Sequence, residues 1–453
     1  MNPEYELALR ETGRIGTGKK YFIKIFGCQM NENDSEILAG ILESLDYQPA
    51  ARIEEADLIV INTCAVRAKP EQKVAALLGK LQDLKREKKD LLIAVGGCMT
   101  QQEEVANYLQ RRFHHVDLIF GTHQLHRFPA LLKQAAESRK TVVDLGEEEN
   151  REGLPIRRAS KFKAWLPVIY GCNNFCSYCV VPFVRGRERS RPFREIMAEA
   201  EQLAREGFLE ITLLGQNVNS YGHDLQEGRD FADLLNHIDR VEGLKRIRFL
   251  TSHPKDLSPR LIRAVAEGEH ICEHFHLPVQ SGSNRILEMM NRRYTRERYL
   301  ELVQAIRESI PGVSITTDII VGFPGETEAD FLQTLDLVEQ ARFDAAFTFN
   351  YSPRRGTRAA LLEDDVPQQE KSRRLERLME LQNRISRETN EALVGQVVEV
   401  LVEGASKANP EMSTGRTRNN KLVHFPRGGE KEGEMLSIKI TQGRTWDLFG
   451  KRA

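Results

Sequence analysis

The sequence predicts an α/β protein in three parts: an N-terminal parallel α/β domain, a partial barrel of six βα units and a small C-terminal β-barrel. Near the N-terminus, apolar runs alternate with helical patterns, which indicates parallel βα units. Six more strand and helix patterns alternate after a charged, aperiodic stretch, too few for a complete eight-unit barrel. The last part, of about 60 residues, changes to short strands separated by turn residues, which is typical of a small β-barrel.

Three apolar runs of the N-terminal part each end in a cysteine. The expected strands are residues 21–27, 56–63 and 90–97, the cysteines that follow are Cys28, Cys64 and Cys98, and helices are expected at residues 35–45, 69–85 and 101–113. Carboxyl ends of parallel strands share one sheet edge, where α/β sheets bind ligands, so we expect these thiols to lie together. One buried cysteine is an ordinary small hydrophobe, but three at equivalent positions favour the ligands of a metal cluster. Structural cysteines are the alternative.

Another three cysteines, Cys172, Cys176 and Cys179, share one short segment. The segment follows an expected strand at residues 164–170, and the glycine, asparagine and proline around it are turn formers, which predicts a loop. Iron–sulfur cubanes are held by cysteine thiolates, usually four. Three thiols in one loop therefore indicate a cluster with one iron left open for chemistry. A zinc loop or three structural cysteines are the alternatives, although zinc ligands usually come in spaced pairs.

The remaining patterns divide the chain. Strands of the partial barrel are expected at residues 164–170, 210–214, 246–250, 274–279, 314–321 and 345–351. Helices are expected at residues 194–206, 231–241, 259–267, 285–290, 296–308 and 328–341, followed by a long charged helix at 368–393. Composition shifts predict an N-terminal extension (1–19), the N-terminal domain (20–145), a linker (146–163), the barrel (164–388) and the C-terminal barrel (389–453).

Composition limits the compartment and the partners. Seven cysteines without an apolar leader predict a reducing cytoplasm, and no apolar run approaches the ~20 residues that a membrane span needs. The formal net charge of −1 does not point to nucleic acid. Local charge does, because Arg185, Arg187 and Arg189 follow the cysteine loop and are candidates for phosphate contacts. A solvated basic face is the ordinary alternative.

Two cysteine triplets in one chain resemble a known family. The loop fits the pattern C-x3-C-x-aromatic-C, with Tyr178 as the aromatic residue, and is similar to the cluster loop of radical S-adenosylmethionine (SAM) enzymes. The whole set of phrases resembles the radical-SAM methylthiotransferases, and within them the branch that modifies dimethylallyl- or isopentenyl-adenosine in tRNA. The phrases are residues 26–36, 62–67, 96–98, 214–217, 251–254, 277–283 and 317–327.

The resemblance implies two [4Fe–4S] clusters and SAM as cofactors. Cys172, Cys176 and Cys179 would hold the catalytic cluster that binds SAM, and Cys28, Cys64 and Cys98 would hold an auxiliary cluster. Residues at later strand ends are expected to contact SAM through backbone carbonyls, amides, a carboxylate near the ribose and a turn near adenine. These predicted contacts are Tyr178, Gly215, Gln216, Asn217, Gln280, Ser281, Asp318 and Phe323.

The implied activity is a transferase reaction: methylthiolation of C2 of the prenylated adenosine at position 37 of tRNA, consuming two SAM. The anticodon stem-loop of tRNA is then the partner, with Arg185, Arg187, Arg189 and a C-terminal OB-like TRAM module as RNA contacts. An electron donor such as flavodoxin or ferredoxin, a monomeric state and no membrane are also expected. Alternatives are the same chemistry on threonylcarbamoyladenosine or on a ribosomal-protein aspartate, an iron–sulfur protein without radical catalysis, and a structural zinc protein.

Overall fold

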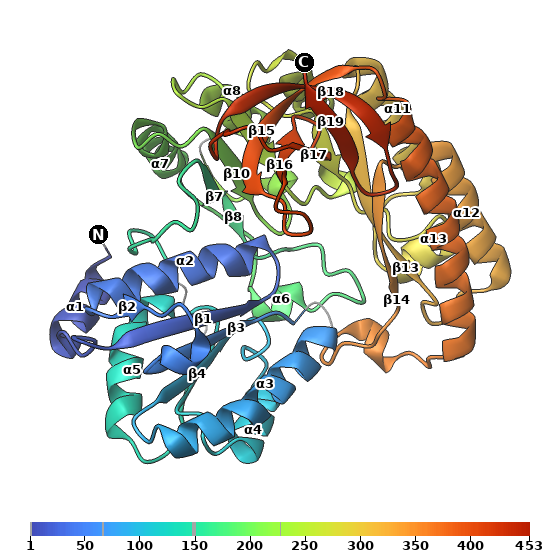
Figure 1. The fold of residues 1–453 in the computed structure, drawn as a ribbon. Helices are drawn as coiled ribbons and strands as arrows, with labels where there is room; N and C mark the ends of the chain where they lie inside the picture. The colour runs from blue at the N-terminus through green and yellow to red at the C-terminus, as the bar shows by residue number, and fades with distance from the viewer. Residues whose placement is uncertain (1, 66–67, 147–150, 227) are drawn as a thin grey trace. The chain divides into compact units, whose positions relative to one another are not determined.

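The computed structural model of the chain describes residues 2–65, 68–146, 151–226 and 228–453, and Figure 1 shows its helices and strands. Positions 66 and 67, in one of the family-like phrases, and 147–150, in the predicted linker, lie outside the described residues. The chain divides into two units that do not follow chain order: unit 1 comprises residues 1–159 and 180–187, and unit 2 comprises residues 160–179 and 188–453. The segment that directly follows the cysteine loop in sequence thus packs with unit 1.

Unit 1 is built on a six-stranded, fully parallel sheet of order β2-β1-β3-β4-β5-β6. Its strands are β1 (Lys20–Phe26), β2 (Gln48–Pro49), β3 (Leu58–Thr63), β4 (Leu92–Gly97), β5 (Leu118–Phe120) and β6 (Val142–Asp144). The chain leaves β1 toward β2 on one side and then continues from β3 on the other. The neighbouring strands β1 and β3 therefore form a switch point, the place where open α/β sheets leave a crevice for ligands.

Helices cover both faces of this sheet because successive strand residues point to opposite sides. On one face, α2 (Gln29–Ser44) and α5 (Phe128–Glu137) pack on Leu58 and Val60. On the other face, α3 (Ala68–Glu87) and α4 (Glu103–Arg112) pack on Ile59 and Ile61. The predicted N-terminal extension contains a further helix, α1 (Pro3–Thr12), which buries Tyr5 in the first of these cores.

The described part of the predicted linker packs largely on unit 1. The Arg158 guanidinium pairs with Glu36 at 3.2 Å, and the Ala159 N–H donates to the same carboxylate at 2.9 Å. Leu154 is buried in the core that α2 lines. The domain boundaries drawn from composition stay predictions.

Unit 2 contains a six-stranded parallel arc, as predicted for a partial barrel. The strands are β7 (Lys163–Pro167), β10 (Glu210–Leu214), β11 (Arg246–Phe249), β12 (His274–His276), β13 (Ser314–Val321) and β14 (Ala345–Asn350). They form the sheets β11-β10-β7 and β12-β13-β14, and a parallel bridge between Ile247 and Ile271 joins the two. A short antiparallel pair, β8 (Ile169–Tyr170) with β9 (Arg189–Ser190), flanks the cysteine loop.

Helices pack on the outer face of this arc. They are α7 (Phe193–Arg205), α8 (Phe231–Ile238), α9 (Pro259–Glu267), α11 (Arg296–Ser309), α12 (Glu328–Ala341) and α13 (Gln368–Glu391). Alternate strand residues such as Ile211, Leu213 and Phe249 form the core beneath these helices. The short helix α10 (Asn284–Met289) packs in a separate apolar cluster with Phe323, and α6 (Val181–Val184) belongs to unit 1. The α/β fold class is confirmed. Among the described residues, no helix is both long and apolar enough to cross a membrane.

The C-terminal part closes into a five-stranded barrel of order β15-β16-β17-β19-β18. Its strands are β15 (Val397–Ala405), β16 (Met412–Thr417), β17 (Leu422–Pro426), β18 (Met435–Gly443) and β19 (Leu448–Arg452). Alternating residues such as Val400, Phe425 and Ile438 fill its interior. The predicted β-barrel is therefore confirmed.

This small barrel also closes the amino-terminal end of the arc. The end of β16 accepts hydrogen bonds from two buried arginines of β11: Arg246 donates to the Arg416 carbonyl at 2.6 Å, and Arg248 to the Thr417 carbonyl at 2.8 Å. Arg418 in turn pairs with Glu273 at 2.6 Å. Arg248 also donates to Glu210 at 2.8 Å, but the other acceptors of both buried guanidinium groups, among the described residues, belong to the C-terminal barrel. The module is therefore structural as well as a candidate RNA contact.

Candidate functional site

The three N-terminal cysteines lie at the carboxyl edge of the unit 1 sheet, at the β1–β3 switch point and the neighbouring strand β4. Cys28 directly precedes α2, Cys64 follows β3 and Cys98 follows β4. A hydrogen bond with the Cys64 side chain lowers the pKa of Cys28 to about 6. Burial raises the pKa of Cys98, whose charge also interacts with that of Cys28. The structure thus brings the three thiols together, while cluster binding by them stays a prediction.

An asparagine pair fixes the backbone that carries two of these thiols. The Asn31 side-chain amide donates to the Asn62 oxygen and to the Thr63 carbonyl, both at 3.0 Å. Asn62 donates in return to the Asn31 carbonyl at 2.9 Å, and the Cys28 thiol contacts the Asn31 oxygen at 3.4 Å. Because Asn31 lies in the first turn of α2 and Asn62 lies one residue before the end of β3, the pair locks the two sides of the switch point together.

Arg185 lies against the auxiliary cysteines and not on the surface. Its Nε donates to the Cys98 sulfur at 3.1 Å, and its Nη2 donates to Asp34 at 2.7 Å. The side chain is buried, with 4% of its surface exposed. This corrects the prediction that Arg185 contacts tRNA phosphates, since a guanidinium bound to a buried carboxylate and a thiol is not available to them. Arg187 is exposed and Arg189 is half-buried, and their RNA contacts stay predictions.

The loop of Cys172, Cys176 and Cys179 is a tight, non-helical turn, as its flanking turn formers predicted. Gly171 has a φ of 71° and Phe175 a φ of 47°, the left-handed region that only glycine adopts without cost. The Cys179 N–H donates to the Cys176 carbonyl at 2.9 Å. These turns fold the chain back so that one short segment presents all three thiols. Burial raises the pKa of Cys172 to about 11.

The segment after α10 holds this loop in place, which the sequence did not reveal. The Ser177 N–H donates to the Met290 carbonyl at 3.0 Å, and the Asn291 side chain donates to the Phe175 carbonyl at 2.9 Å. The buried Arg292 donates to the Cys176 sulfur at 3.3 Å and to the Pro278 carbonyl at 2.6 Å. Arg292 thus links the cysteine loop to the segment that follows β12.

Several non-glycine residues with positive φ gather where the arc strands and their loops end. They include Phe175 (47°), Thr251 (68°), Gln280 (72°) and Asn291 (57°). Such residues cost about 1–3 kcal/mol each and cluster at ligand sites, where the surroundings hold them. Their concentration at the carboxyl edge marks this edge as the functional one.

The residues that follow β10 have two kinds of role: some hold the local structure, and one is open to a cofactor. A Cβ on Gly215 would meet Ile169 at 2.4 Å, so only glycine fits beside the cysteine-bearing strand. Gln216 is half-buried, and its Oε1 is buried without a hydrogen-bond partner among the described residues. Asn217 is already engaged: its amide donates to Asp256 at 2.7 Å and its oxygen accepts the His253 N–H at 3.0 Å. Gln216 is the freer candidate for a cofactor contact.

The residues that follow β12 also have these two kinds of role. The Gln280 backbone bridges to β13, with its N–H donating to the Asp318 carbonyl at 2.9 Å, and its buried side-chain oxygen has no partner among the described residues. Ser281 is fully buried and its hydroxyl accepts the Ser283 N–H at 3.2 Å, close to the Thr334 hydroxyl. The structure therefore gives Ser281 a supporting role and leaves Gln280 with unused hydrogen-bonding capacity.

The inner face of the arc carries Asp318 beside two residues that were not predicted as site residues. Asp318 is half-buried on β13 and lies 3.5 Å from the His276 imidazole. Its partner across the sheet is Phe347, whose side chain is 53% exposed and meets the His276 ring edge-on, with 5.9 Å between ring centroids. The two-residue alternation of the β14 sequence is the signal that places Phe347 on this face.

Tyr178 and Phe323 meet in one apolar cluster. The buried members of this cluster are Ile286, Met290, Phe323, Tyr351 and Ala359, and Tyr178 packs against them. The rings of Phe323 and Tyr351 make an edge contact with centroids 5.2 Å apart. Two predicted SAM contacts from different strand ends thus share an apolar surface next to the cysteine loop.

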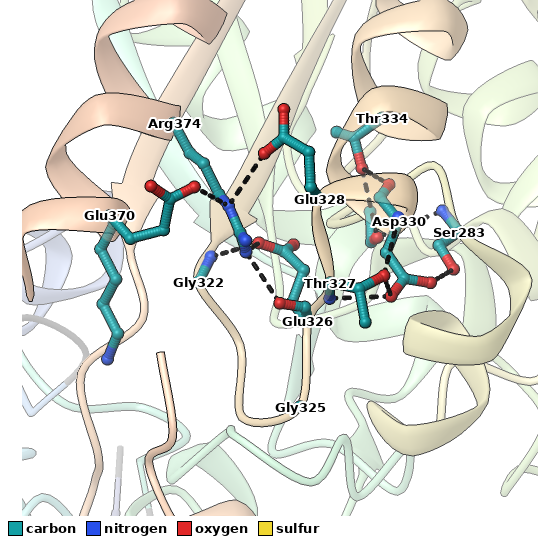
Figure 2. A network of polar contacts seen from close by, with 12 residues as sticks. Ser283, Gly322, Gly325, Glu326, Thr327, Glu328, Asp330, Thr334, Glu370 and Arg374 are labelled. Atoms are coloured by element: carbon teal, nitrogen blue, oxygen red, sulfur yellow. Dashed lines mark hydrogen bonds and ion pairs between the residues drawn. The ribbon is translucent and has the colours of Figure 1, made fainter. Parts of the chain in front are cut away.

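The turn after β13 is held by buried charges, and Figure 2 shows the network. Gly322, with a φ of 68°, donates its N–H to the Glu326 carboxylate at 2.7 Å. Arg374 of α13 donates to the same carboxylate at 2.8 Å and to the Glu326 carbonyl at 2.9 Å. Burial raises the pKa of Glu326, and Arg374 opposes that rise. The backbone that presents Phe323 is therefore fixed by one ion pair.

A second carboxylate locks the neighbouring helix to the β12 loop. Asp330 accepts hydrogen bonds from the Ser283 hydroxyl at 2.6 Å and from the Thr327 N–H at 2.9 Å, and it pairs with Arg285. Although its partial burial acts the other way, these bonds hold the pKa of Asp330 below its usual range. Figure 2 shows Ser283 and Thr327 converging on this carboxylate.

Arg374→Met should loosen the turn and weaken SAM binding. The change leaves Glu326 buried without its cation, and breaking a buried pair costs about 3–5 kcal/mol. Thermal unfolding should show a lower melting temperature, and equilibrium binding should show weaker affinity for SAM. Arg373→Met on the same helix, where Arg373 is 54% exposed, is the matched control and should change neither. Equal SAM affinity in both variants would contradict this role.

Both thiol triplets suit the ligand chemistry of cubanes, in which each thiolate binds a different iron. Arg185 and Arg292 each donate to a cysteine sulfur, and Arg185 keeps a buried N–H group without a partner among the described residues. Within that part of the chain, no group of three or more His, Cys, Asp or Glu side chains is gathered tightly enough for a single metal ion. A cubane does not need such a group, because each of its three thiolates binds a different iron.

Comparison with known families and structures defines the class. Family models match at residues 166–338 (radical SAM superfamily), 20–121 (uncharacterized protein family UPF0004) and 391–452 (TRAM domain). The radical SAM methyltransferase TsrM from Kitasatospora setae has a similar fold, with a TM-score of 0.56 over 76% of this chain and 74% of that chain at 16% identity. The chain is a radical SAM protein with added UPF0004 and TRAM domains, and that superfamily implies a [4Fe–4S] cluster and SAM.

Relatives that match over nearly their whole length narrow the class. The chain is 53% identical over 447 residues to the tRNA-2-methylthio-N(6)-dimethylallyladenosine synthase of Acetivibrio thermocellus, covering 98% of this chain and 93% of that protein. It is 54% identical over 442 residues to the enzyme of that name from Desulforamulus reducens, covering 97% of each. The chain belongs to the family of tRNA-2-methylthio-N(6)-dimethylallyladenosine synthases, so the resemblance drawn from its motifs is confirmed.

Proposed function

We propose that this protein is a transferase that methylthiolates C2 of N6-dimethylallyl- or isopentenyl-adenosine at position 37 of tRNA, consuming two SAM. The observation that carries the proposal is a pair of cysteine triplets, each at the carboxyl edge of its own parallel sheet, in a chain of this family. Those edges are where parallel α/β folds place their chemistry. Each triplet would hold one [4Fe–4S] cluster with one iron open.

In unit 2, Cys172, Cys176 and Cys179 would hold the cluster at which SAM is cleaved. When bound, the cluster and SAM together supply the radical chemistry of hydrogen abstraction. The protein's part is to orient and to exclude water. Gln216 and Gln280 offer buried amide oxygens without partners among the described residues, which suits the amino group of SAM.

The apolar cluster and the inner face of the arc suit different parts of the bound molecules. The Tyr178 and Phe323 side chains provide a dry surface next to the cysteine loop, which suits the adenine of SAM. Asp318 and His276 offer hydrogen-bonding groups on the inner face. The exposed Phe347 ring gives an extruded base a surface on which to stack.

In unit 1, Cys28, Cys64 and Cys98 would hold the auxiliary cluster from which sulfur is delivered. The Asn31–Asn62 pair fixes the backbone on both sides of the switch point, so the ligand positions are set before the metal arrives. An electron donor such as flavodoxin or ferredoxin, a monomeric state and a cytoplasmic location stay predictions.

Arg187 and Arg189 are proposed to meet the phosphates of the anticodon stem-loop. Replacing both by glutamine should weaken tRNA binding and flatten its dependence on salt, because each phosphate contact releases counterions. Binding measured at several salt concentrations gives the slope, and iron content should stay at the wild-type level. Arg205→Gln, an exposed arginine on α7, is the matched control. An unchanged slope in the double variant would remove both residues from the interface.

The substrate assignment is tested by mass spectrometry of tRNA nucleosides from cells with and without the protein. The methylthio form of the prenylated adenosine should disappear with the protein, and the unmodified prenylated form should accumulate. A reconstituted enzyme that ignores prenylated tRNA but methylthiolates a ribosomal protein or threonylcarbamoyladenosine would overturn the substrate and leave the radical chemistry standing.

A further inference from the structure

The three nitrogen atoms of the Arg185 guanidinium have different surroundings. Nε donates to the Cys98 sulfur at 3.1 Å and Nη2 donates to the Asp34 carboxylate at 2.7 Å. Nη1 is buried and has no hydrogen-bond partner among the described residues. A buried guanidinium N–H without an acceptor is costly and uncommon in native proteins, so it calls for an acceptor that occupies the site in the working enzyme.

The guanidinium is held rigidly enough to aim that N–H. Asp34, which lies in the first turns of α2, also pairs with Arg151, and Arg151 donates to the Thr122 carbonyl at 2.6 Å. The Asp34 carboxylate is therefore held by two arginines, Arg151 and Arg185. Arg185 itself follows α6, whose last residue Val184 accepts a hydrogen bond from the Thr122 hydroxyl at 2.7 Å. The position of Arg185 is thus fixed by its neighbours and not by the metal site.

A charged donor of this kind is best matched by an anionic acceptor, and the Nε hydrogen bond places the guanidinium next to Cys98. The positive charge of Arg185 acts on both Cys98 and Cys28, so a thiolate-bound cluster would place its sulfur atoms within the reach of this field. Hydrogen bonds from outside the ligand set tune the reduction potential of such clusters. A fixed donor also stabilises negative charge on sulfur without reorganisation.

We propose that Arg185 is a positioning residue of the auxiliary site: Nε orients the Cys98 ligand, and Nη1 donates to an anionic sulfur at the auxiliary cluster. The inference rests on the proposed function, because it requires a cluster on Cys28, Cys64 and Cys98. It goes further in giving the sulfur of this cluster a charged protein donor that none of the cysteines can supply.

The test isolates the auxiliary cluster. In a chain with Cys172, Cys176 and Cys179 replaced by alanine, Arg185→Lys is compared with the double change Arg185→Met and Asp34→Asn, which removes both charges together. The readouts are iron per chain, the midpoint potential of the cluster followed by electron paramagnetic resonance, and binding of hydrosulfide as the anionic sulfur probe. Asp34→Asn alone separates the contribution of the carboxylate, which also acts on Cys98. Arg86→Met on α3, where the Arg86 side chain is 70% exposed, is the matched control.

Loss of the Nη1 donor should move the midpoint potential lower and weaken hydrosulfide binding about tenfold or more, the scale of one charge-assisted hydrogen bond. Arg185→Lys, which keeps the charge without the fork of donors, should fall between the parent and the double variant. The Arg86→Met control should stay close to the parent.

An unchanged potential and hydrosulfide affinity in Arg185→Lys, with iron retained, would reduce Arg185 to a packing residue and overturn the inference. The lysine variant decides the matter if the double variant does not fold. Failure of the proposed function looks different: the parent with intact Arg185 would then bind no iron at all on Cys28, Cys64 and Cys98.

Discussion

Replacing Cys172, Cys176 and Cys179 together by alanine should abolish the cleavage of SAM and leave about one cubane of iron per chain. The reason is that these three thiols share one loop and have no other thiol in unit 2 apart from Cys272 at the opposite end of the arc. SAM cleavage is measured as 5′-deoxyadenosine released by the reduced protein, and iron and sulfide are measured chemically.

The complementary triple change, Cys28, Cys64 and Cys98 to alanine, should lose a similar amount of iron while keeping SAM cleavage and losing the methylthiolated product. Cys272→Ala is the matched control, because Cys272 is a buried cysteine just before β12 and lies in neither triplet. A Cys28–Cys64–Cys98 variant that kept its full iron content and still formed product would refute the auxiliary cluster.

The cysteine positions could be predicted because the signal is local. An apolar run that ends in a turn places its next residue at a strand end, and three such runs are enough to put Cys28, Cys64 and Cys98 on one edge. The parallel order of the sheet then brings the thiols together without any further information. The switch point between β1 and β3 was not predicted, because strand order depends on which face each crossover helix covers.

The supports of both triplets could not be predicted, because they come from distant parts of the chain. Arg185 lies 87 residues from Cys98, and Arg292 lies 116 residues from Cys176. In the sequence, each is one arginine in a basic cluster. The basic run after the loop favoured RNA contacts, whereas burial next to Asp34 gives Arg185 a different role. Clusters of like charge do not reveal which member turns inward.

Some short strands were also not predicted from the sequence. The strands β2 and β6 have two and three residues, too few to show a period, and they exist because the sheet edges offer them partners. Strand β16 alternates between small polar residues and glycine, Ser413, Gly415 and Thr417, so no apolar face marked it. Closure of the barrel, and not strand propensity, makes this segment a strand.

Removing residues 394–453 should destabilise unit 2 as a whole and not only weaken tRNA binding. Arg246 has no exposed side-chain surface, and the deletion removes its partners Glu399 and the Arg416 carbonyl. Arg248 loses the Thr417 carbonyl and keeps only Glu210 as its charged partner. Buried cations stripped of acceptors cost several kcal/mol each, so the truncated chain should melt at a clearly lower temperature and take up less iron at the Cys172 loop.

A point change separates this structural role from RNA binding. Arg248→Met in the full chain leaves Glu210 buried without its cation and should lower the unfolding free energy by about 3–5 kcal/mol, read from denaturant unfolding. Arg260→Met is the control and should cost at most about 1 kcal/mol, because the Arg260 side chain is 58% exposed. A truncated chain with the same melting temperature as the full-length protein would contradict the structural role of the C-terminal barrel. If the expected result holds, tRNA contacts of the C-terminal barrel have to be sought with charge changes on its exposed strands. Deleting the barrel would not isolate those contacts, because it also removes acceptors of buried arginines in the arc that carries the proposed SAM-cleaving site.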